Sequence, residues 1–180
     1  MLVGVWVNIT RRKTAELRAA EDRDLFHTLI EHIPDSIYFK NRESRFVLAN
    51  TATANKLGVP TPADLTGRTD DYFFDQTMSD ISRKEEMDIM VTGRPIRARL
   101  HHETWLHKDD SWSQISKFPW YGRNGELKGI VGISSDVTKL VKTEIKATET
   151  ARILEERNRT LEKEIDLARE IQFALLPYEI

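Results

Sequence analysis

The stretch IVGISSDVT at residues 130–138 decides the fold, because a related stretch, LVGVWVNIT, stands at residues 2–10. Each copy is a β-rich run that ends on Asn or Asp, one further residue and Thr, and each is followed by a charged helical stretch. Chance similarity between short apolar runs is the alternative explanation. Because the copies lie a domain-sized distance apart, we interpret them as equivalent ends of two tandem modules.

The composition limits the class of protein. The chain has 180 residues, 27 basic and 29 acidic side chains and no cysteine. A net charge of -2 gives no general attraction to nucleic acid or to a membrane surface, so we expect neither partner. Without cysteine, disulfides and thiolate metal sites are excluded. No apolar run reaches the ~20 residues that span a bilayer, and we expect a cytoplasmic protein.

Apolar periodicity and turn residues predict one α+β module between two long helices. Asn-Gly at 124–125 is the strongest hairpin signal in the chain. The strands follow one another in hairpins, which favours an antiparallel sheet with helices on one face. The expected order is a helix at 11–33, strands at 36–40 and 45–50, a short helix at 53–57, irregular turns at 64–74, a helix at 78–91, and strands at 96–106, 111–121 and 127–135.

A final helix is expected at 139–176, in which every fourth heptad position is apolar, while Glu144 and Gln172 make the first positions of the seam imperfect. This pattern favours a two-stranded coiled coil, although a single solvated helix is the alternative. Asn158 falls on the seam, where a buried Asn fixes the register of a parallel dimer. The predicted dimer coil consists of Leu140, Ala147, Ala151, Leu154, Asn158, Leu161, Ile165, Ala168 and Leu175.

Three motifs make residues 26–142 resemble the PAS sensor family. The first is IYFK at 37–40 with RF at 45–46 and Asn50, the second is GRTD at 67–70, and the third is the ending from Gly129 to Thr138. The resemblance implies a PAS fold, with a five-stranded antiparallel sheet and helices that cup a small-molecule pocket or a filled core. It also implies signal input that passes through the sheet into the exit helix, with Asp136 and Thr138 as relay and helix cap.

The resemblance gives the domain boundaries that we expect. Residues 1–10 would be the last strand of a preceding PAS module, 11–33 a linker helix, 34–138 the PAS domain and 139–176 the coiled-coil signalling helix. The tail at 168–177 resembles the start of metal-dependent serine phosphatases of the sporulation-stage-II-E and sigma-factor-regulator type. Residues 177–180 would then open a phosphatase domain of the PP2C type, whose metal-binding aspartates lie beyond Ile180, and this chain would carry no activity itself.

The expected pocket combines apolar side chains with two polar contacts, although the same side chains could simply pack as a core. Lys117 could point inward toward an anionic ligand or outward to solvent. The candidate lining residues are Ile37, Phe39, Phe46, Leu48, Asn50, Tyr72, Phe73, Met87, Met90, Ile115, Lys117 and Ile133.

Cofactor chemistry is restricted by residue type. A flavin photosensor of the related light-sensing branch needs a cysteine for its adduct, and the chain has none. The helix expected at 78–91 holds no histidine, which argues against a haem ligand there. His101, Glu103 and His107 could share one strand face and hold a metal, but their spacing is untypical of closed zinc sites, so we favour a solvated face or a partner contact and expect no metal.

The leading hypothesis is a bacterial PAS sensor that forms a parallel homodimer and controls a serine/threonine phosphatase in the same polypeptide. The alternative is a ligand-free PAS interaction module that feeds another output, such as a cyclase or a kinase. No histidine lies after residue 107, which argues against a kinase dimerisation helix in this chain. No motif supports an autonomous enzyme.

Overall fold

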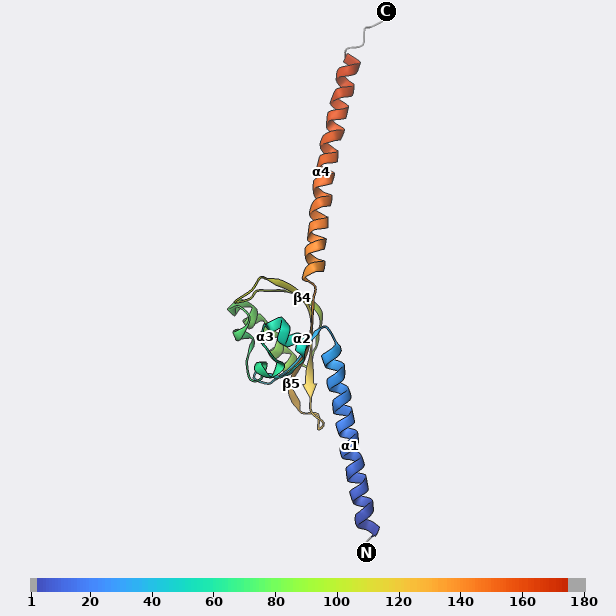
Figure 1. The fold of residues 1–180 in the computed structure, drawn as a ribbon. Helices are drawn as coiled ribbons and strands as arrows, with labels where there is room; N and C mark the ends of the chain where they lie inside the picture. The colour runs from blue at the N-terminus through green and yellow to red at the C-terminus, as the bar shows by residue number, and fades with distance from the viewer. Residues whose placement is uncertain (1–2, 175–180) are drawn as a thin grey trace, which may run out of the picture. The chain divides into compact units, whose positions relative to one another are not determined.

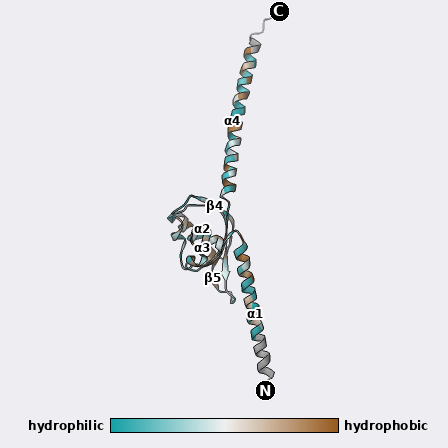
Figure 2. Ribbon diagram, viewed as in Figure 1, coloured by the Kyte–Doolittle hydropathy of each residue, from teal (hydrophilic) through white to brown (hydrophobic). Residues whose placement is uncertain are grey.

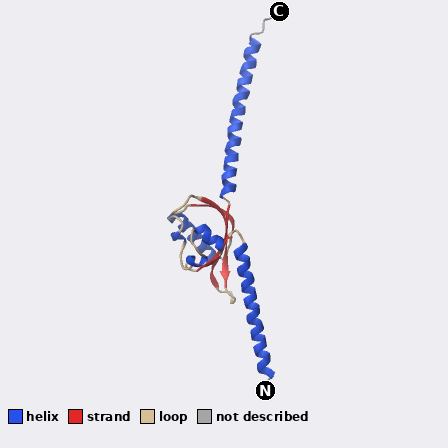
Figure 3. Ribbon diagram, in the orientation of Figure 1, coloured by secondary structure: helices blue, strands red, loops and turns tan. Residues whose placement is uncertain are grey.

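The computed structural model describes residues 3–174, with the side chains of 12–171. A five-stranded antiparallel sheet forms its centre, with the strand order β2-β1-β5-β4-β3 (Figures 1 and 3). This confirms the predicted α+β class and the PAS fold. The strands are β1 (Ser36–Asn41), β2 (Phe46–Ala49), β3 (Ile96–Glu103), β4 (Ser111–Tyr121) and β5 (Leu127–Asp136).

The segment between β2 and β3 supplies the helices that cover the inner face of the sheet (Figure 3). Beneath them lies a compact apolar cluster, in which the Phe46 ring meets Phe73 edge to face. This cluster occupies only part of the interface between the layers. The helices are α2 (Thr51–Leu57), the short 3-10 turns η1 (Pro62–Leu65) and η2 (Asp70–Tyr72), and α3 (Gln76–Thr92).

Local chemistry sets the ends of α2 and α3. The Asn50 side chain accepts a hydrogen bond from the Thr53 N–H and so caps α2, and Asp75 caps α3 in the same way. Gly58 and Gly93 end the two helices in the left-handed conformation, with φ of 74° and 71°. The predicted helix ends at these two glycines are confirmed.

Gly132 on β5 leaves room for the side chain of a residue on the neighbouring strand β1. It pairs with Tyr38 on β1 and with Lys117 on β4. A Cβ atom at Gly132 would lie 2.2 Å from the Tyr38 ring, so the ring can lie across the strand only above a glycine. The PAS-like glycine of this strand therefore has a steric reason.

The first helix, α1 (Val3–His32), corrects one expectation. Residues 3–10 were expected to be a strand, but they lie in this helix. The five described strands pair only with one another. A strand needs a neighbour for its backbone groups, whereas a helix satisfies them within itself, so this segment is helical in the absence of a paired strand. The tandem-module interpretation itself stays a prediction.

The last helix, α4 (Thr138–Ala174), forms a unit of its own, and Val137 ends the other compact unit. The surface of α4 mixes hydrophobic residues with charged ones (Figure 2). Arg152 pairs with Glu149 and Glu156 along this surface. Leu175 and the expected phosphatase start at 177–180 lie outside the described residues. Within residues 3–174, no helix is both long and apolar enough to cross a membrane.

Candidate functional site

A small cavity of about 40 Å³ lies between the inner face of the sheet and the covering helices. Both apolar and charged side chains line this cavity, and charged side chains are unusual in a domain interior. The lining residues come from β1, β2, β3, β4, β5, α2, η2 and α3. They are Ser36, Tyr38, Phe46, Thr53, Lys56, Leu57, Asp70, Phe74, Met78, Ser82, Glu103, Ile115, Lys117 and Ser134.

Lys40 carries the first of three paired ammonium groups, of which those of Lys40 and Lys117 are buried and that of Lys56 is partly buried. Its side chain is 1% exposed, and its Nζ atom donates to Asp70 Oδ2 at 2.7 Å and to Glu86 Oε1 at 2.6 Å. Burial alone would lower the pKa of Lys40, but the two carboxylates outweigh it and the pKa is raised. In the same way Lys40 and Lys117 overcome burial and lower the pKa of Asp70. Lys40 is therefore held charged between η2 and α3.

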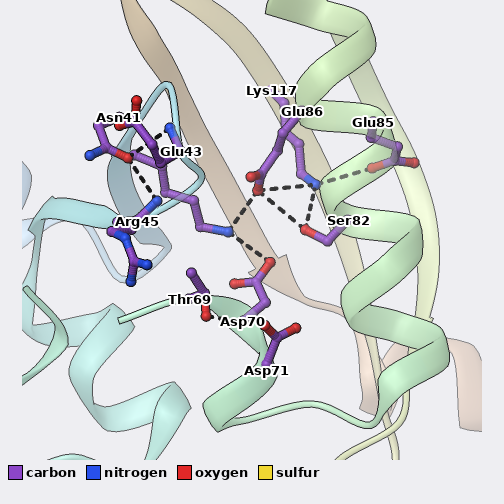
Figure 4. A network of polar contacts seen from close by, with 11 residues as sticks. Asn41, Glu43, Arg45, Thr69, Asp70, Asp71, Ser82, Glu85, Glu86 and Lys117 are labelled. Carbon is purple, nitrogen blue, oxygen red and sulfur yellow. Dashed lines mark hydrogen bonds and ion pairs between the residues drawn. The ribbon is translucent and has the colours of Figure 1, made fainter. Parts of the chain in front are cut away.

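Lys117 on β4 supplies the second ammonium group, which faces α3 (Figure 4). It donates to Ser82 Oγ at 3.0 Å and to Glu85 Oε2 at 3.1 Å, and Glu86 Oε1 lies 3.9 Å away. His101 Nε2 lies 3.2 Å from Glu85 Oε1. Burial would raise the pKa of Glu85, but the contacts with His101 and Lys117 lower it to about 2.

Lys56 on α2 supplies the third ammonium group. Its Nζ atom donates to Glu103 Oε1 at 2.8 Å and to the hydroxyls of Ser113 and Ser134, each at 2.7 Å. These acceptors stand on β3, β4 and β5, so one side chain ties α2 to three strands. Glu103 Oε2 also accepts from Ser111 and Ser113.

The three lysines explain why so much charge is buried here. A buried charge is costly unless it is paired and hydrogen-bonded, and each ammonium has at least one carboxylate partner. Among the described side chains, Glu86 Oε2 is a buried oxygen with no hydrogen-bond partner. The arrangement offers polar binding and a fixed helix–sheet geometry.

Comparison with known proteins supports what the fold shows. Residues 30–142, well over half of the chain, match the PAS fold family. The chain belongs to the PAS family. Its PAS domain consists of the sheet with α2 and α3, and the buried lysines lie inside it.

Two curated relatives of the PAS domain are signalling enzymes. The chain is 23% identical over 129 residues to the methanogenesis regulatory histidine kinase FilI of Methanothrix harundinacea, and covers 14% of that protein. It is 27% identical over 139 residues to a diguanylate cyclase of Vibrio cholerae, and covers 42% of it. The matches take in 72% and 74% of this chain, which thus spans less than half the length of either relative.

Solved PAS structures share the fold. The PAS domain of Bordetella pertussis BvgS matches with a TM-score of 0.53 and 24% identity, over 72% of this chain and 98% of that one. VqmA bound to DPO matches with a TM-score of 0.56 and 22% identity, over 65% of this chain and 57% of that one. An RNA-binding light-oxygen-voltage receptor matches with a TM-score of 0.58 and 16% identity, over 72% of this chain and 37% of that one.

Three predicted pocket residues, Phe46, Ile115 and Lys117, line the cavity of the PAS domain. Four others lie on the outer face of the sheet, where Phe39 meets Phe26 of α1 and Trp120 of β4. That face also carries Ile37, Leu48 and Ile133, because Leu48 pairs with Phe39 and Ile133 pairs with Ile37 across neighbouring strands.

The remaining predicted pocket residues take other places. Asn50 is fully buried, and its amide caps α2 and bonds the backbone of Ile30 and Asp35. Phe73 belongs to the apolar cluster but does not line the cavity. Tyr72 and Met87 are 60% and 55% exposed. Met90 is partly buried and also lies outside the lining.

Sequence reasoning missed Lys40, Lys56 and the acidic residues of α3. It assumed that the apolar face of each element points inward, whereas Ser82, Glu85 and Glu86 are the buried face of α3. The sequence signal that could have found these residues was the match between basic and acidic side chains on different elements. Three lysines on a helix and two strands matched acidic residues on α3, β3 and the turn at Asp70.

The histidine-containing strand has a structural role in the PAS domain. His101 and Glu103 share the inner face of β3, as alternation predicts, and both are buried. His107 is exposed and lies beyond the strand. No group of three metal-ligating side chains occurs in the part of the chain that the structure describes. His101 instead contacts Glu85, and Glu103 binds Lys56.

Proposed function

We propose that this PAS domain is a sensory module that passes its state through β5 into α4. The observation that carries the proposal is the short path between cavity and helix. Ser134 of β5 binds Lys56 at the cavity, β5 ends two residues later at Asp136, and α4 begins at Thr138. Val137, the residue between them, donates its N–H to Trp112 O on β4. A shift of β5 is therefore transmitted covalently to the helix start.

We further propose that α4 pairs with a second copy as a parallel coiled coil. Leu154, Leu161 and Ile165 occupy the predicted seam and are about half exposed in the single chain. Asn158 between them would fix the register. Most of the stability of helices in proteins comes from the packing of an apolar face, and pairing would supply the burial that the apolar residues of α4 lack.

For the output we propose a serine/threonine phosphatase domain that follows α4. The support is the resemblance at 168–177, whose first part continues α4 and whose remainder lies outside the described residues. A second output, a kinase or a cyclase, is favoured by a different observation, namely that the two curated relatives are a histidine kinase and a diguanylate cyclase.

The substitution Asn158→Ile in the full-length protein tests the coupling. It replaces a polar seam residue with an apolar one, so we expect a more stable dimer and a changed output, because a helix pair locked in one state no longer responds. Output is measured as metal-dependent dephosphorylation of a phosphoserine peptide, with autophosphorylation and GTP cyclisation assayed in parallel.

Thr160→Ile is the matched control, since residue 160 lies off the seam. If full-length Asn158→Ile forms a more stable dimer but has the output of the unmodified protein, the proposed coupling is contradicted. Activity in the kinase or cyclase assay alone would replace the phosphatase with the second output.

A further inference from the structure

Lys56 stands between the inner cavity and a second, larger pocket. This outer pocket has a volume of about 210 Å³ and lies against α2, the β3–β4 connection and the end of β5. Ser36, Lys56 and Ser134 line both hollows. The two hollows are therefore neighbours, and these three residues are the partition between them.

The partition can open while Lys56 keeps its ion pair with Glu103 and gives up only its serine contacts. The Lys56 ammonium has three N–H donors, and all three are used by Glu103, Ser113 and Ser134. If Lys56 moves, Glu103 keeps the hydroxyl donors Ser111 and Ser113 on its other oxygen, at 2.9 and 2.8 Å. The carboxylate is then not left without hydrogen bonds, and a ligand acceptor can take the place of a serine on the ammonium.

The outer pocket has an apolar wall and a second ammonium. Lys108 Nζ lies 3.4 Å from the centroid of the Trp105 ring and donates to the backbone oxygen of Lys56. Burial and the nearby Lys56 charge lower the pKa of Lys108. Pro34, Ala52 and Trp105 supply the apolar part of the lining, and the Trp105 ring is itself contacted by Phe74 and Lys108.

Taken together, the two hollows are lined by three lysines and four carboxylates. Lys56 and Lys117 face Asp70 and Glu103 around the inner cavity. The outer pocket is lined by two lysines and two aspartates, namely Lys56, Lys108, Asp109 and Asp136. An anionic ligand would add to the excess of carboxylates, and a cationic ligand would lie against the Lys56 and Lys108 ammonium groups, so either charge is costly in this partly buried site.

We propose that the two hollows form one binding site for a small uncharged molecule with a hydrogen-bond acceptor on an apolar body. The molecule enters through the outer pocket, displaces the serine contacts of Lys56 and accepts a hydrogen bond from its ammonium. Benzene fits a dry cavity of about 150 Å³, so the inner cavity alone is too small for such a body and the outer pocket is needed. This inference rests on the proposed sensory function and names its ligand class and its point of action, Ser134.

Isobutyramide and isobutyrate test the ligand class, because they share a shape and differ in charge. Each is titrated into the isotope-labelled chain, and backbone amide shifts are followed by NMR. We expect saturable shifts for isobutyramide at Ser36, Lys56 and Ser134. We expect isobutyrate to bind at least about tenfold more weakly than isobutyramide. Lys56→Met preserves chain length and removes the donor, and we expect it to weaken isobutyramide binding about fivefold or more.

Lys84→Met, on the exposed face of α3, is the control and should bind as the unmodified chain does. Equal binding of isobutyrate overturns the charge argument. The absence of saturable shifts at the three residues overturns the site itself, and both results come from the unmodified chain. Neither result affects the output assay with Asn158→Ile, so failure of this site and failure of the sensory function are distinguishable.

Discussion

At the residue scale, the PAS domain depends on contacts that a single atom can disturb. Tyr38 is partly buried, and the ammonium of Lys40 lies 5.5 Å from its ring centroid. Burial, with the charges of nearby carboxylates, raises the pKa of Tyr38 well above its usual value. The ring keeps this position because Gly132 leaves space beneath it.

Replacing Gly132 with Ala should therefore destabilise the domain, although alanine usually suits a strand better than glycine. The added Cβ would meet the Tyr38 ring at 2.2 Å, and we expect a loss of about 1–3 kcal/mol from overpacking. Urea unfolding followed by fluorescence measures this loss. Gly122→Ala is a matched control, because its closest contact is the flexible end of Lys128 at 2.9 Å. Equal stability of the two variants would contradict the steric role of Gly132.

At the element scale, the sequence predicted the sheet well because strand order depends on turns and alternation. The hairpin at Asn124-Gly125 lies where the turn chemistry placed it, and Gly58 ends α2. In α3 the apolar residues Ile81 and Met87 are exposed, whereas Glu86 is buried together with Met78 and Ile89. Period and hydrophobicity alone cannot find a helix whose acidic face meets lysines from distant strands, because each partner by itself looks like a surface residue.

The acidic face of α3 makes stability depend on pH. The pKa of Glu85 is lowered from 4.5 to about 2 in the folded state, so this residue stabilises the fold fully above about pH 4.5. The contribution is lost as the pH falls toward about 2, and the lowered pKa of Asp70 acts in the same direction. We expect a loss from Glu85 of about 2–3 kcal/mol at most, because one pKa unit corresponds to about 1.4 kcal/mol and solvent screens the contact of Glu85 with the exposed Arg99. Urea midpoints measured from pH 6 to pH 2 check this.

Glu85→Gln should be less stable at neutral pH and should lose less stability on acidification. A conservative change at exposed Asp88 on the same helix, Asp88→Asn, should leave the acid dependence as it is. Parallel acid curves for Glu85→Gln and the unmodified chain would count against the role of this carboxylate.

At the scale of the whole molecule, the chain consists of two units with different sources of stability. The PAS domain has its own apolar cluster and buried ion pairs. Every described side chain of α4 from 143 onward is exposed, so its apolar residues gain nothing within one chain. The heptad pattern identified this helix, but no sequence feature gives the affinity of the coil that we propose.

Leu161→Glu should dissociate the proposed dimer, because it places a charge in the seam. Leu167→Glu makes the same change off the seam, at a leucine of similar exposure, and should leave the dimer intact. Sedimentation equilibrium of the two variants and the unmodified chain gives the masses. A dimer that survives Leu161→Glu but not Leu167→Glu would move the interface to another face of the helix.

The three paired ammonium groups also constrain how this sequence can change over generations. Lys40 finds its partners 30 and 46 positions further along, and the carboxylate of Lys56 is 47 positions away. Loss of one lysine leaves a buried carboxylate unpaired, which selection removes, so a neutral replacement is viable only when its distant partners change as well. The interior of this domain is thus inherited as linked sets of residues, and variants of the PAS domain should gain or lose these charges together.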